Sequence, residues 1–233
     1  MNSLEVINFT HIPDPLIKCD FENVYSPSDD SFLLIDYFKK KVSKTHFDGL
    51  NLSEIRNILD LGTGTGIIAI FLQLIKNQNP NFKANIVASD ILEEAIRCAK
   101  ENESINNIKN KIKFIQSDLF MDIPEELHSA FNIIIFNPPY LPSSHYVKEE
   151  NKKNIDLSWD GGLKGFEILT DFLKNARPFL NLEEGHYIYC ISSSGSNLSL
   201  LDQQIRILGY KKEIVDRKHI FFEDILLNRL LYK

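Results

Sequence analysis

Cysteine, tryptophan and long apolar runs are all scarce in this sequence of 233 residues. The three cysteines, Cys19, Cys98 and Cys190, lie far apart in the chain and show neither metal-ligand spacing nor a disulfide framework, so we expect a reducing compartment and assign no metal site. The longest apolar run, residues 66–74, has about half of the 20 residues that a bilayer span needs. Residues 1–9 lack a basic start followed by an apolar stretch, so we expect no secretory signal and a cytoplasmic location.

An excess of basic residues is missing as well. There are 26 Lys and Arg residues against 32 Asp and Glu, a net charge of −6, which weighs against a protein whose main task is to hold phosphate backbones. The chain is 43% hydrophobic and 25% charged, an ordinary globular composition. With no internal repeat or linker to divide it, we expect a single domain over 1–233, with an extension and helix over 1–55 and a core over 56–233.

Short β-rich runs alternate with longer amphipathic helical patterns. Five segments are expected to be strands: 57–61, 85–90, 111–117, 131–137 and 186–192. Apolar residues recur with helical spacing between and around them, in 29–40, 67–76, 92–99, 166–180 and 198–208. Two further strands, 211–216 and 225–232, are joined by a connection too short for a parallel crossover. The pattern predicts an α/β fold with a doubly wound, seven-stranded, mostly parallel sheet and a C-terminal antiparallel hairpin.

The first chemical motif is a glycine-rich turn that follows the first strand. Asp60, Gly62, Gly64 and Gly66 form an Asp-x-Gly-x-Gly-x-Gly pattern, in which glycines permit a sharp turn and a close approach of ligand to backbone. Ile67 stands where a dinucleotide site would carry its third glycine, and no Gly-Lys-Ser/Thr of a P-loop follows. The spacing is that of S-adenosylmethionine (SAM) methyltransferases. The alternative is a strand–helix turn that binds nothing.

Two more acids follow at the ends of the next two strands. Asp90 comes one βαβ step after Asp60, at the place where doubly wound folds hold ribose hydroxyls. Asp118, followed by Leu119, ends the third strand, where a carboxylate could accept from an exocyclic adenine amine. As surface residues these acids would be unremarkable singly, but parallel strands bring all three to one edge of the sheet.

The most specific motif is Asn137-Pro138-Pro139-Tyr140, directly after the strand 131–137. The prolines remove two backbone donors, so the Asn137 side-chain oxygen and the Pro138 carbonyl can accept hydrogen bonds from one NH2 group. Tyr140 is expected to offer a flat face to a planar substrate. Gripping both N–H bonds would orient a conjugated nitrogen toward a methyl sulfonium. The alternative, a rigid strand-to-loop turn, gives no reason for the neighbouring SAM pattern.

Taken together, these motifs resemble the HemK/PrmC-type protein glutamine N5-methyltransferases. Residues 23–34, Asn-Val-Tyr-Ser-Pro-Ser-Asp-Asp-Ser-Phe-Leu-Leu, are similar to the V-Y-x-P-x-(D/E)-D-(S/T)-F-L-L opening of the short archaeal and eukaryotic branch. Residues 158–165, beginning Ser-Trp-Asp-Gly-Gly, are similar to its W-x-G-G-x-x-G element. The resemblance implies a Rossmann-like SAM-dependent methyltransferase fold with a catalytic core over 56–233. It also implies that the larger helical domain of bacterial members is absent or replaced by one helix.

The resemblance also implies roles for matching positions. Cofactor contacts carry over to Ser31 (methionine end), Asp60 and Gly62 (amino and carboxylate groups), Asp90 (ribose), and Asp118 with the Leu119 backbone (adenine). Asn137 matches the residue that holds the substrate amide. The family's substrate is the glutamine of a Gly-Gly-Gln loop in a class-1 translation release factor, and eukaryotic members need a small zinc-binding partner subunit.

Two rival functions remain open at this stage. Adenine-N6 and cytosine-N4 methyltransferases of RNA or DNA use the same Asn-Pro-Pro-Tyr chemistry on a flipped base, but normally need a basic channel. Residues 137–165 contain four Lys and four acidic residues, so we expect the rim of the substrate site to be neutral and to fit a slim peptide loop better than a nucleic acid. A SAM-binding module without catalysis gives no reason for the complete tetrapeptide.

Three further features have plainer interpretations. Ser28-Asp29-Asp30 is expected to cap the first helix and to form its first turn. The nearly charge-balanced stretch 143–154 is expected to be a solvated loop and a candidate substrate lid. Trp159, the only tryptophan, is more typical of packing than of chemistry.

Overall fold

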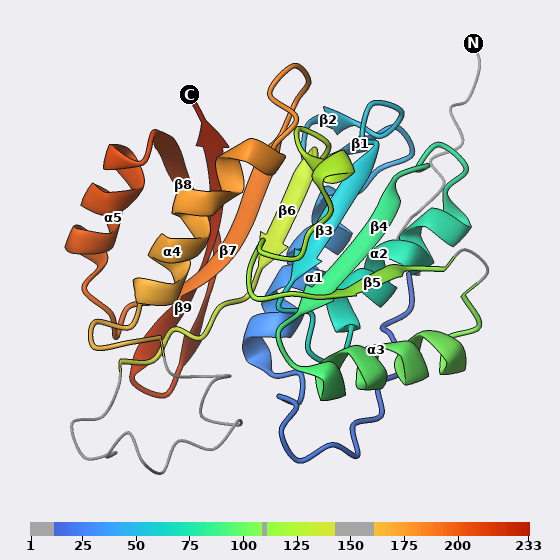
Figure 1. Cartoon of the computed structure of the whole chain (residues 1–233), viewed down its shortest axis with the longest axis horizontal. Helices are drawn as coiled ribbons and strands as arrows, with labels where there is room; N and C mark the ends of the chain where they lie inside the picture. Colours follow the sequence, from blue (N-terminus) through green and yellow to red (C-terminus); the bar gives the residue numbers. More distant parts are fainter. Residues whose placement is uncertain (1–11, 109–110, 143–160) are drawn as a thin grey trace.

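A seven-stranded sheet forms the centre of the molecule, with strand order β5-β4-β3-β6-β7-β9-β8 (Figure 1). The computed structural model describes residues 12–108, 111–142 and 161–233. The strands of this sheet are β3 (Asn57–Leu61), β4 (Asn85–Asp90), β5 (Lys113–Gln116), β6 (Ile133–Phe136), β7 (Tyr187–Ser193), β8 (Tyr210–Ile220) and β9 (Glu223–Tyr232). The pairs among β5, β4, β3, β6 and β7 are parallel, whereas β9 pairs antiparallel with β7 and β8. The predicted fold class is confirmed, C-terminal hairpin included.

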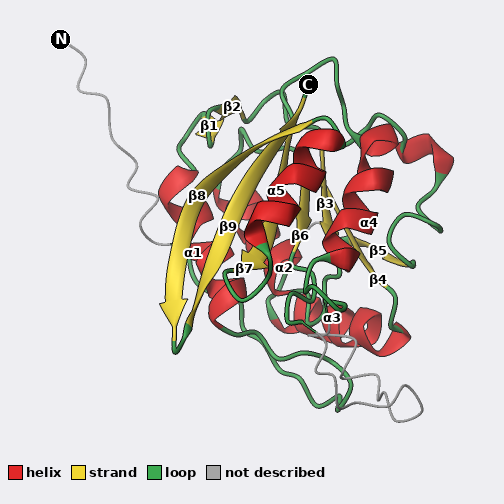
Figure 2. Cartoon of the chain, turned by 90° about the vertical axis from the view of Figure 1, so that its left-hand side faces the viewer, coloured by secondary structure: helices red, strands yellow, loops and turns green. Residues whose placement is uncertain are grey.

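Helices cover both faces of the sheet. They are α1 (Asp29–Lys41), α2 (Ile67–Gln78), α3 (Glu93–Ile105), α4 (Glu167–Ala176) and α5 (Leu198–Ile207), with 3-10 turns η1 (Glu125–Leu127) and η4 (Arg177–Phe179). Figure 2 shows α1 on one side of the sheet and α4 and α5 on the other. Alternate residues of β6 enter different cores: Ile133 and Ile135 pack with α1 and α2, whereas Ile134 and Phe136 pack with α4 and α5. A strand buried on both faces has to be apolar throughout, as β6 is.

Several elements differ from the sequence prediction. β8 runs on to Ile220 rather than ending at 216, because antiparallel pairing with β9 satisfies the backbone of its polar end, past a bulge between Ile214 and Asp216. α4 ends at Ala176, and residues 177–179 tighten into the 3-10 turn η4, which contains a proline. The short ribbon of β1 (His46–Phe47) and β2 (Leu50–Asn51) was not predicted, since two-residue strands leave no periodic pattern.

A buried carboxylate fixes the end of α1 to the sheet. The Asp48 Oδ2 atom accepts hydrogen bonds from the Tyr37 and Tyr189 hydroxyls at 2.7 Å each and lies 2.9 Å from Nη1 of Arg229. Asp48 is 8% exposed, so burying its charge is favourable only with such a full set of partners. Anchored there, α1 brings its opposite end, with Asp30 and Ser31, to the carboxyl edge of the parallel strands.

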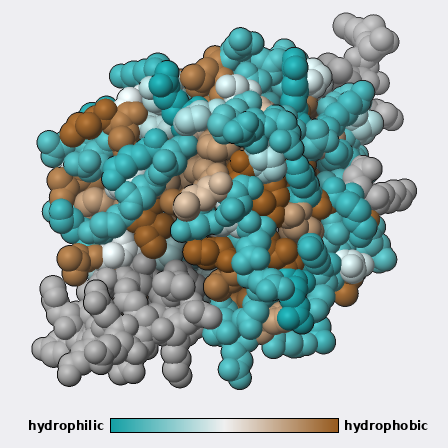
Figure 3. Space-filling model, in the orientation of Figure 1, coloured by the Kyte–Doolittle hydropathy of each residue, from teal (hydrophilic) through white to brown (hydrophobic). Residues whose placement is uncertain are grey.

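The surface is mixed in character. Figure 3 shows hydrophilic residues over much of one face, with hydrophobic residues gathered near its middle. The largest exposed apolar side chains include Phe221 and Phe222, at 88% and 100% exposed, in the turn between β8 and β9. Within the described ranges, no helix combines the length and the apolarity that a membrane crossing requires.

Candidate active site

A cavity of about 430 Å³ lies where the carboxyl ends of β3, β4 and β6 meet the start of α1. This volume is within the range of small-molecule sites, about 300–1,000 Å³. Most of the residues proposed from the sequence line it: Ser31, Asp60, Gly62, Gly64, Asp90, Asp118, Leu119, Asn137 and Pro138. Two others, Gly66 and Tyr140, are not part of its lining. The topology therefore brings together, at one cavity, residues that are more than 100 positions apart in the chain.

The glycines of the first motif are required for different structural reasons. Gly62, Gly64 and Gly66 all have positive φ angles, of 67°, 54° and 82°. Residues that carry a Cβ rarely adopt such angles. A Cβ on Gly66 would lie 2.9 Å from the Cβ of Ala99, so this glycine lets α2 begin against α3. Gly66 is thus needed for helix packing, whereas Gly62 and Gly64 face the cavity.

Asp60 is a buried acid at the end of β3. It is 3% exposed, and its Oδ2 atom accepts from the Thr63 hydroxyl at 2.6 Å and from the Ala69 N–H at 3.1 Å. Burial raises the pKa of Asp60 to about 7, with a smaller upward contribution from the charge of Asp90, although the two hydrogen bonds oppose the shift. Near neutral pH this carboxyl is therefore poised between its two charge states.

Asp90 holds the glycine-rich turn from the neighbouring strand. Its Oδ2 atom accepts from the Gly64 N–H at 2.8 Å, and its Oδ1 atom accepts from the Leu92 N–H at 3.0 Å. Burial raises its pKa as well. Each carboxylate oxygen keeps a further lone pair for a ligand hydroxyl. Among the described residues no Lys or Arg forms an ion pair with Asp60 or Asp90, so this part of the cavity is suited to a cationic ligand.

The third acid lies on a strained turn after β5. Leu119 has a φ of 47°, an uncommon conformation for a branched side chain. Ser117 stabilises the turn, because its hydroxyl donates to the Leu119 carbonyl at 3.0 Å and accepts from the Asp122 N–H at 3.0 Å. Asp118 is exposed, unlike Asp60 and Asp90. The turn thus places the Asp118 side chain and the Leu119 backbone at the wall of the cavity.

Asn137 follows the last residue of β6 and lines the cavity. Its side-chain oxygen Oδ1 is buried and has no hydrogen-bond partner among the described residues. Leaving a buried acceptor unpaired costs about 1–3 kcal/mol, so an atom of this kind calls for a partner from a ligand or an ordered water. The missing partner has to be an N–H or O–H donor.

Tyr140 lies beside the cavity and is not part of its lining. Its hydroxyl donates to Oδ2 of Asp30 at 3.2 Å, and burial and the charge of Asp30 raise its pKa. Asp30 itself is 3% exposed and lines the cavity. In this structure Tyr140 therefore contacts the cavity wall through Asp30, and a flat face presented to a substrate stays a prediction.

The start of α1 also differs in detail from the sequence prediction. Ser28 is the N-cap residue, but its side chain makes no capping hydrogen bond. Instead, Oδ1 of Asp30 accepts from the Ser31 N–H at 2.6 Å. The expected N-cap position and acidic first turn are confirmed, but the Asp30 carboxylate, and not the Ser28 side chain, accepts from the free N–H.

The Gly-Gly-x-x-Gly turn braces the backbone of the Asn-Pro-Pro-Tyr segment. The Gly161 N–H donates to the Leu141 carbonyl at 2.8 Å, and a Cβ on Gly161 would lie 2.9 Å from the Pro139 carbonyl oxygen. The Ser196 hydroxyl donates to the Tyr140 carbonyl at 3.1 Å. These glycines are therefore needed for close backbone contact. The candidate lid 143–154 and Trp159 lie outside the described residues.

Sequence reasoning assigned no role to several lining residues. Asn23, Val24, Tyr25, Pro27 and Asp30 form one wall, ahead of and within the start of α1, and Ile168 and Asp171 of α4 contribute another part. The Val-Tyr-x-Pro opening was a usable signal for the first group. The α4 residues follow an ordinary amphipathic pattern, and nothing in the sequence distinguishes them.

Comparisons with known proteins agree with this geometry. The family model "Methyltransferase small domain" matches residues 33–155. The chain is 32% identical over 206 residues to a protein of Methanocaldococcus jannaschii named "Putative protein N5-glutamine methyltransferase", covering 88% of this chain and 89% of that protein. It is 27% identical over 193 residues to the eRF1 methyltransferase catalytic subunit mtq2 of Schizosaccharomyces pombe, covering 78% of this chain and 79% of the relative.

Among solved structures, the fold is similar to a chain of the E. cuniculi Mtq2–Trm112 complex, described as responsible for methylation of the eRF1 translation termination factor. The TM-score is 0.60 at 20% identity, covering 91% of this chain and 99% of that one. The sequence matches assign the chain to a family, and the structural match supports the fold. The chain belongs to the methyltransferase small-domain family and, within it, to the HemK/PrmC-type protein glutamine N5-methyltransferases.

Proposed function

We propose that the protein transfers the methyl group of SAM to a side-chain amide nitrogen, that of the glutamine in the Gly-Gly-Gln loop of a class-1 translation release factor. The observation that carries this proposal is the buried, unpartnered Oδ1 of Asn137 at the cavity wall. A primary amide supplies the N–H donor that this oxygen lacks. The whole chain would act as one methyltransferase domain, with residues 56–233 as its catalytic core.

The residues of the cavity fit SAM. A volume of about 430 Å³ suits a ligand of this size, and the acids Asp60 and Asp90 suit its positive charges. Ser31, Asp60, Gly62 and Gly64 would hold the methionine end, Asp90 the ribose, and Asp118 with the Leu119 backbone the adenine. When bound, SAM supplies an electrophilic methyl group on a sulfonium.

At the acceptor side, the chain's own residues orient the nitrogen. Asn137 Oδ1 would accept one N–H of the substrate amide and the Pro138 carbonyl the other, turning the nitrogen lone pair toward the cofactor. Both oxygens would stabilise the positive charge that develops on nitrogen as the N–C bond forms. Pro138 and Pro139 have no N–H, so no donor at these two positions competes for the acceptors.

The substrate class follows from the relatives and from the charge of the sequence that follows Asn137. The relative from Schizosaccharomyces pombe is named for eRF1 methylation, and residues 137–165 carry equal numbers of basic and acidic side chains. A flipped base would bring phosphates and need basic residues around it, whereas a Gly-Gly-Gln loop is slim and uncharged. We also propose that a small activator subunit takes part, since the similar Mtq2 structure is a complex with Trm112. Whether that subunit binds zinc stays an expectation of the resemblance, as does a cytoplasmic location.

The test is methylation with radiolabelled SAM of three acceptors: a class-1 release factor, the same factor with Glu in place of the Gly-Gly-Gln glutamine, and RNA or DNA. The enzyme is assayed alone and co-expressed with the activator. We expect the mass of one added CH2 group on that glutamine, with weak dependence on salt. Label found only on nucleic acid, with a steep salt dependence, would replace this function by adenine-N6 methylation.

Asp90 provides a separate test of cofactor binding. Changing Asp90→Ala removes an acceptor for two ribose hydroxyls, so we expect a loss of about 1–3 kcal/mol in SAM binding free energy. Isothermal calorimetry measures it, with circular dichroism and thermal unfolding to show that the turn at Gly64 survives. Equal affinity in a folded variant would remove Asp90 from the cofactor site.

A further inference from the structure

A segment ahead of α1, residues 16–27, lies along α3 and contains a turn at 21–24; we call it the N-terminal strap. Its backbone is held by two asparagines one helical turn apart. Asn106 accepts from the Leu16 N–H at 2.9 Å and donates to the Leu16 carbonyl at 2.8 Å, and Asn102 accepts from the Lys18 N–H at 2.8 Å. The strap is therefore docked by side-chain amides that replace the hydrogen bonds of a neighbouring strand.

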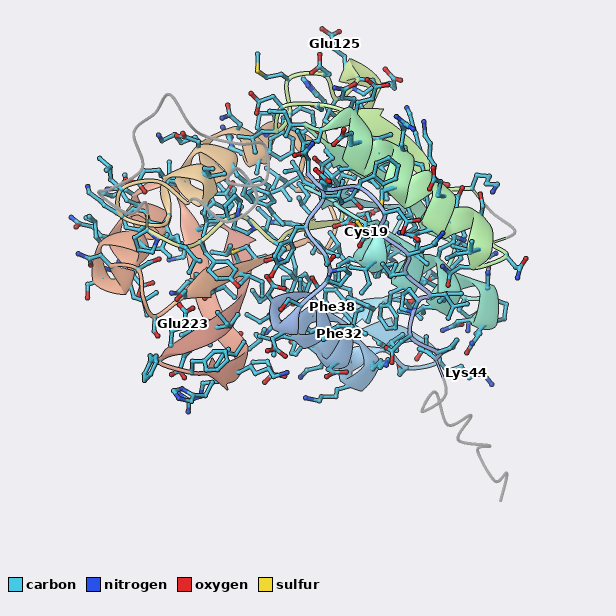
Figure 4. All side chains as sticks on the ribbon, turned by 90° about the horizontal axis from the view of Figure 1, so that it is seen from below. Cys19, Phe32, Phe38, Lys44, Glu125 and Glu223 are labelled. Carbon is cyan, nitrogen blue, oxygen red and sulfur yellow. The ribbon has the colours of Figure 1, made fainter. Side chains whose placement is uncertain are left out.

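The next position along this seam is a cysteine. Cys98, one turn before Asn102, is fully buried, and its Sγ lies 3.6 Å from the Lys18 carbonyl oxygen. Cys19 follows directly in the strap and packs in the same small cluster as Cys98 and Val24. Burial and, after it, the nearby Cys19 thiol raise the pKa of the Cys98 thiol. Two cysteines that lie far apart in the sequence are thus neighbours in the fold, which the sequence did not predict. In Figure 4, a view from below, Cys19 lies near the green ribbon of α3.

The strap is also one wall of the cavity. Asn23, Val24, Tyr25 and Pro27 line it, and the Sγ of Cys19 is 3.7 Å from the Val24 carbonyl oxygen. Asn102, which holds the strap, also donates to the Thr65 carbonyl of the glycine-rich turn at 2.9 Å. Any covalent link between strap and α3 would therefore act on two sides of the same site.

We propose that Cys19 and Cys98 form a redox-modification site, at which a peroxide converts the two thiols into a disulfide that ties the strap to α3. Cys19 is partly exposed and reacts first: its sulfur attacks the O–O bond of hydrogen peroxide, gives a sulfenic acid and releases one water. The Cys98 sulfur then attacks the Cys19 sulfur, the S–O bond breaks and a second water leaves. The balance is two thiols and one peroxide to one disulfide and two waters.

Two properties of the pair define how this modification behaves. Burial raises the pKa of the Cys98 thiol to about 12, so the second step is slow at neutral pH and requires sustained oxidant. Closing a covalent loop between positions 19 and 98 restricts the unfolded chain, so the oxidised protein unfolds at a higher temperature. This consequence does not depend on what the cavity binds.

The effect on the site rests on the proposed function. A strap that cannot leave α3 keeps its wall of the cavity in place, so the oxidised protein releases the product S-adenosylhomocysteine several-fold more slowly than the reduced one. Its affinity changes little, because slower release is matched by slower entry. Dithiothreitol restores the rate.

The experiment treats the whole chain with hydrogen peroxide and maps tryptic peptides by mass spectrometry without reduction. We expect peptides 19–39 and 98–100 to be joined and a rise in Tm that dithiothreitol reverses, in wild type and in the control Cys190→Ser. Neither change should occur in Cys19→Ser or Cys98→Ser. Cys190 is a suitable control because it is as fully buried as Cys98 but packs in a different hydrophobic cluster, the one that includes α4 and α5.

Several outcomes would overturn the proposal. They are a sulfinic acid on Cys19 without a link, a link between two molecules, a link to Cys190, or a joined pair whose Tm does not rise. Release of S-adenosylhomocysteine is then measured by stopped-flow fluorescence in oxidised and reduced protein. If the disulfide forms and no S-adenosylhomocysteine binds to either form, the proposed function fails while the modification site stands. If it binds and leaves at equal rates, the site has no effect on the cavity.

Discussion

Asn137→Ala is expected to bind SAM within a few-fold of the wild type and to lose about 100- to 1,000-fold in methyl transfer. The side-chain oxygen of Asn137 is buried and has no partner in the described part of the chain, so we expect its hydrogen bond to be made with the methyl acceptor. The loss should appear in kcat as well as in kcat/KM, because the hydrogen bond strengthens as charge develops on the substrate nitrogen. Calorimetry with SAM and single-turnover methylation measure the two effects separately.

Two further variants distinguish a role of Asn137 in methyl transfer from a purely structural role. Asn137→Asp keeps the shape and the acceptor but adds a charge, so it should keep a measurable part of the rate. Asn175→Ala, a surface asparagine of α4 whose side chain donates to the Asp171 carbonyl at 2.8 Å, serves as the matched control and should be fully active. Near-normal turnover of Asn137→Ala would mean that this asparagine only shapes the turn after β6.

Asp60→Asn is expected to change stability and binding in opposite directions. The pKa of Asp60 is about 7 in the folded protein, against about 3.9 in an unfolded chain. The unfolded chain therefore loses this proton first, and folding stability falls as pH rises from about 4 to 7. An amide carries no such penalty, so the ligand-free variant should be more stable than wild type at pH 8, by about 1–3 kcal/mol, and nearly equal to it at pH 4.

Binding should show the reverse. A carboxylate paired with the ammonium group of SAM contributes about 1.5–3 kcal/mol, so Asp60→Asn should bind SAM about 10- to 100-fold more weakly. In the wild type, SAM affinity should fall as pH drops below about 7, because a proton then competes for Asp60, and this slope should vanish in Asp60→Asn. Thermal unfolding and calorimetry between pH 5.5 and 8.5 measure both. A variant that is less stable than wild type at pH 8 would contradict the assigned pKa.

Most of the fold could be predicted from the alternation of strands and helices, because a buried strand or helix shows a characteristic spacing of apolar residues. β6 shows this well: it is buried on both faces, and its apolar run has no other explanation in a chain of this composition. What could not be predicted depends on contacts between distant segments. The hydrogen bonds of Asn102 and Asn106 to the strap, and the carboxylate of Asp48 under α1, follow no periodic pattern.

The site was predictable where chemistry is tied to strand ends. Asp60 and Asp90 lie at the carboxyl ends of β3 and β4, and Asn137 follows β6 directly, so parallel strand order brings them to one cavity. The hydrogen bond of Tyr140 to Asp30 was not predictable in the same way, since the two residues lie 110 positions apart in the chain. Gly66 belongs to the same motif as Gly62, yet whether a glycine faces a ligand or a helix depends on the neighbour it meets, here Ala99.

The hydrogen bond from the Gly161 N–H to the Leu141 carbonyl has a consequence for how the family could change its substrates. This hydrogen bond joins the residues on either side of segment 142–160. The Ser196 hydroxyl, just ahead of α5, donates to the neighbouring Tyr140 carbonyl and strengthens the same junction. A loop whose ends are already closed can be lengthened or shortened cheaply, since doubling a loop costs only about 0.6 kcal/mol of closure entropy. Insertions between these two anchors can thus be tried by evolution, or by an engineer, while the Asn-Pro-Pro-Tyr backbone keeps its geometry.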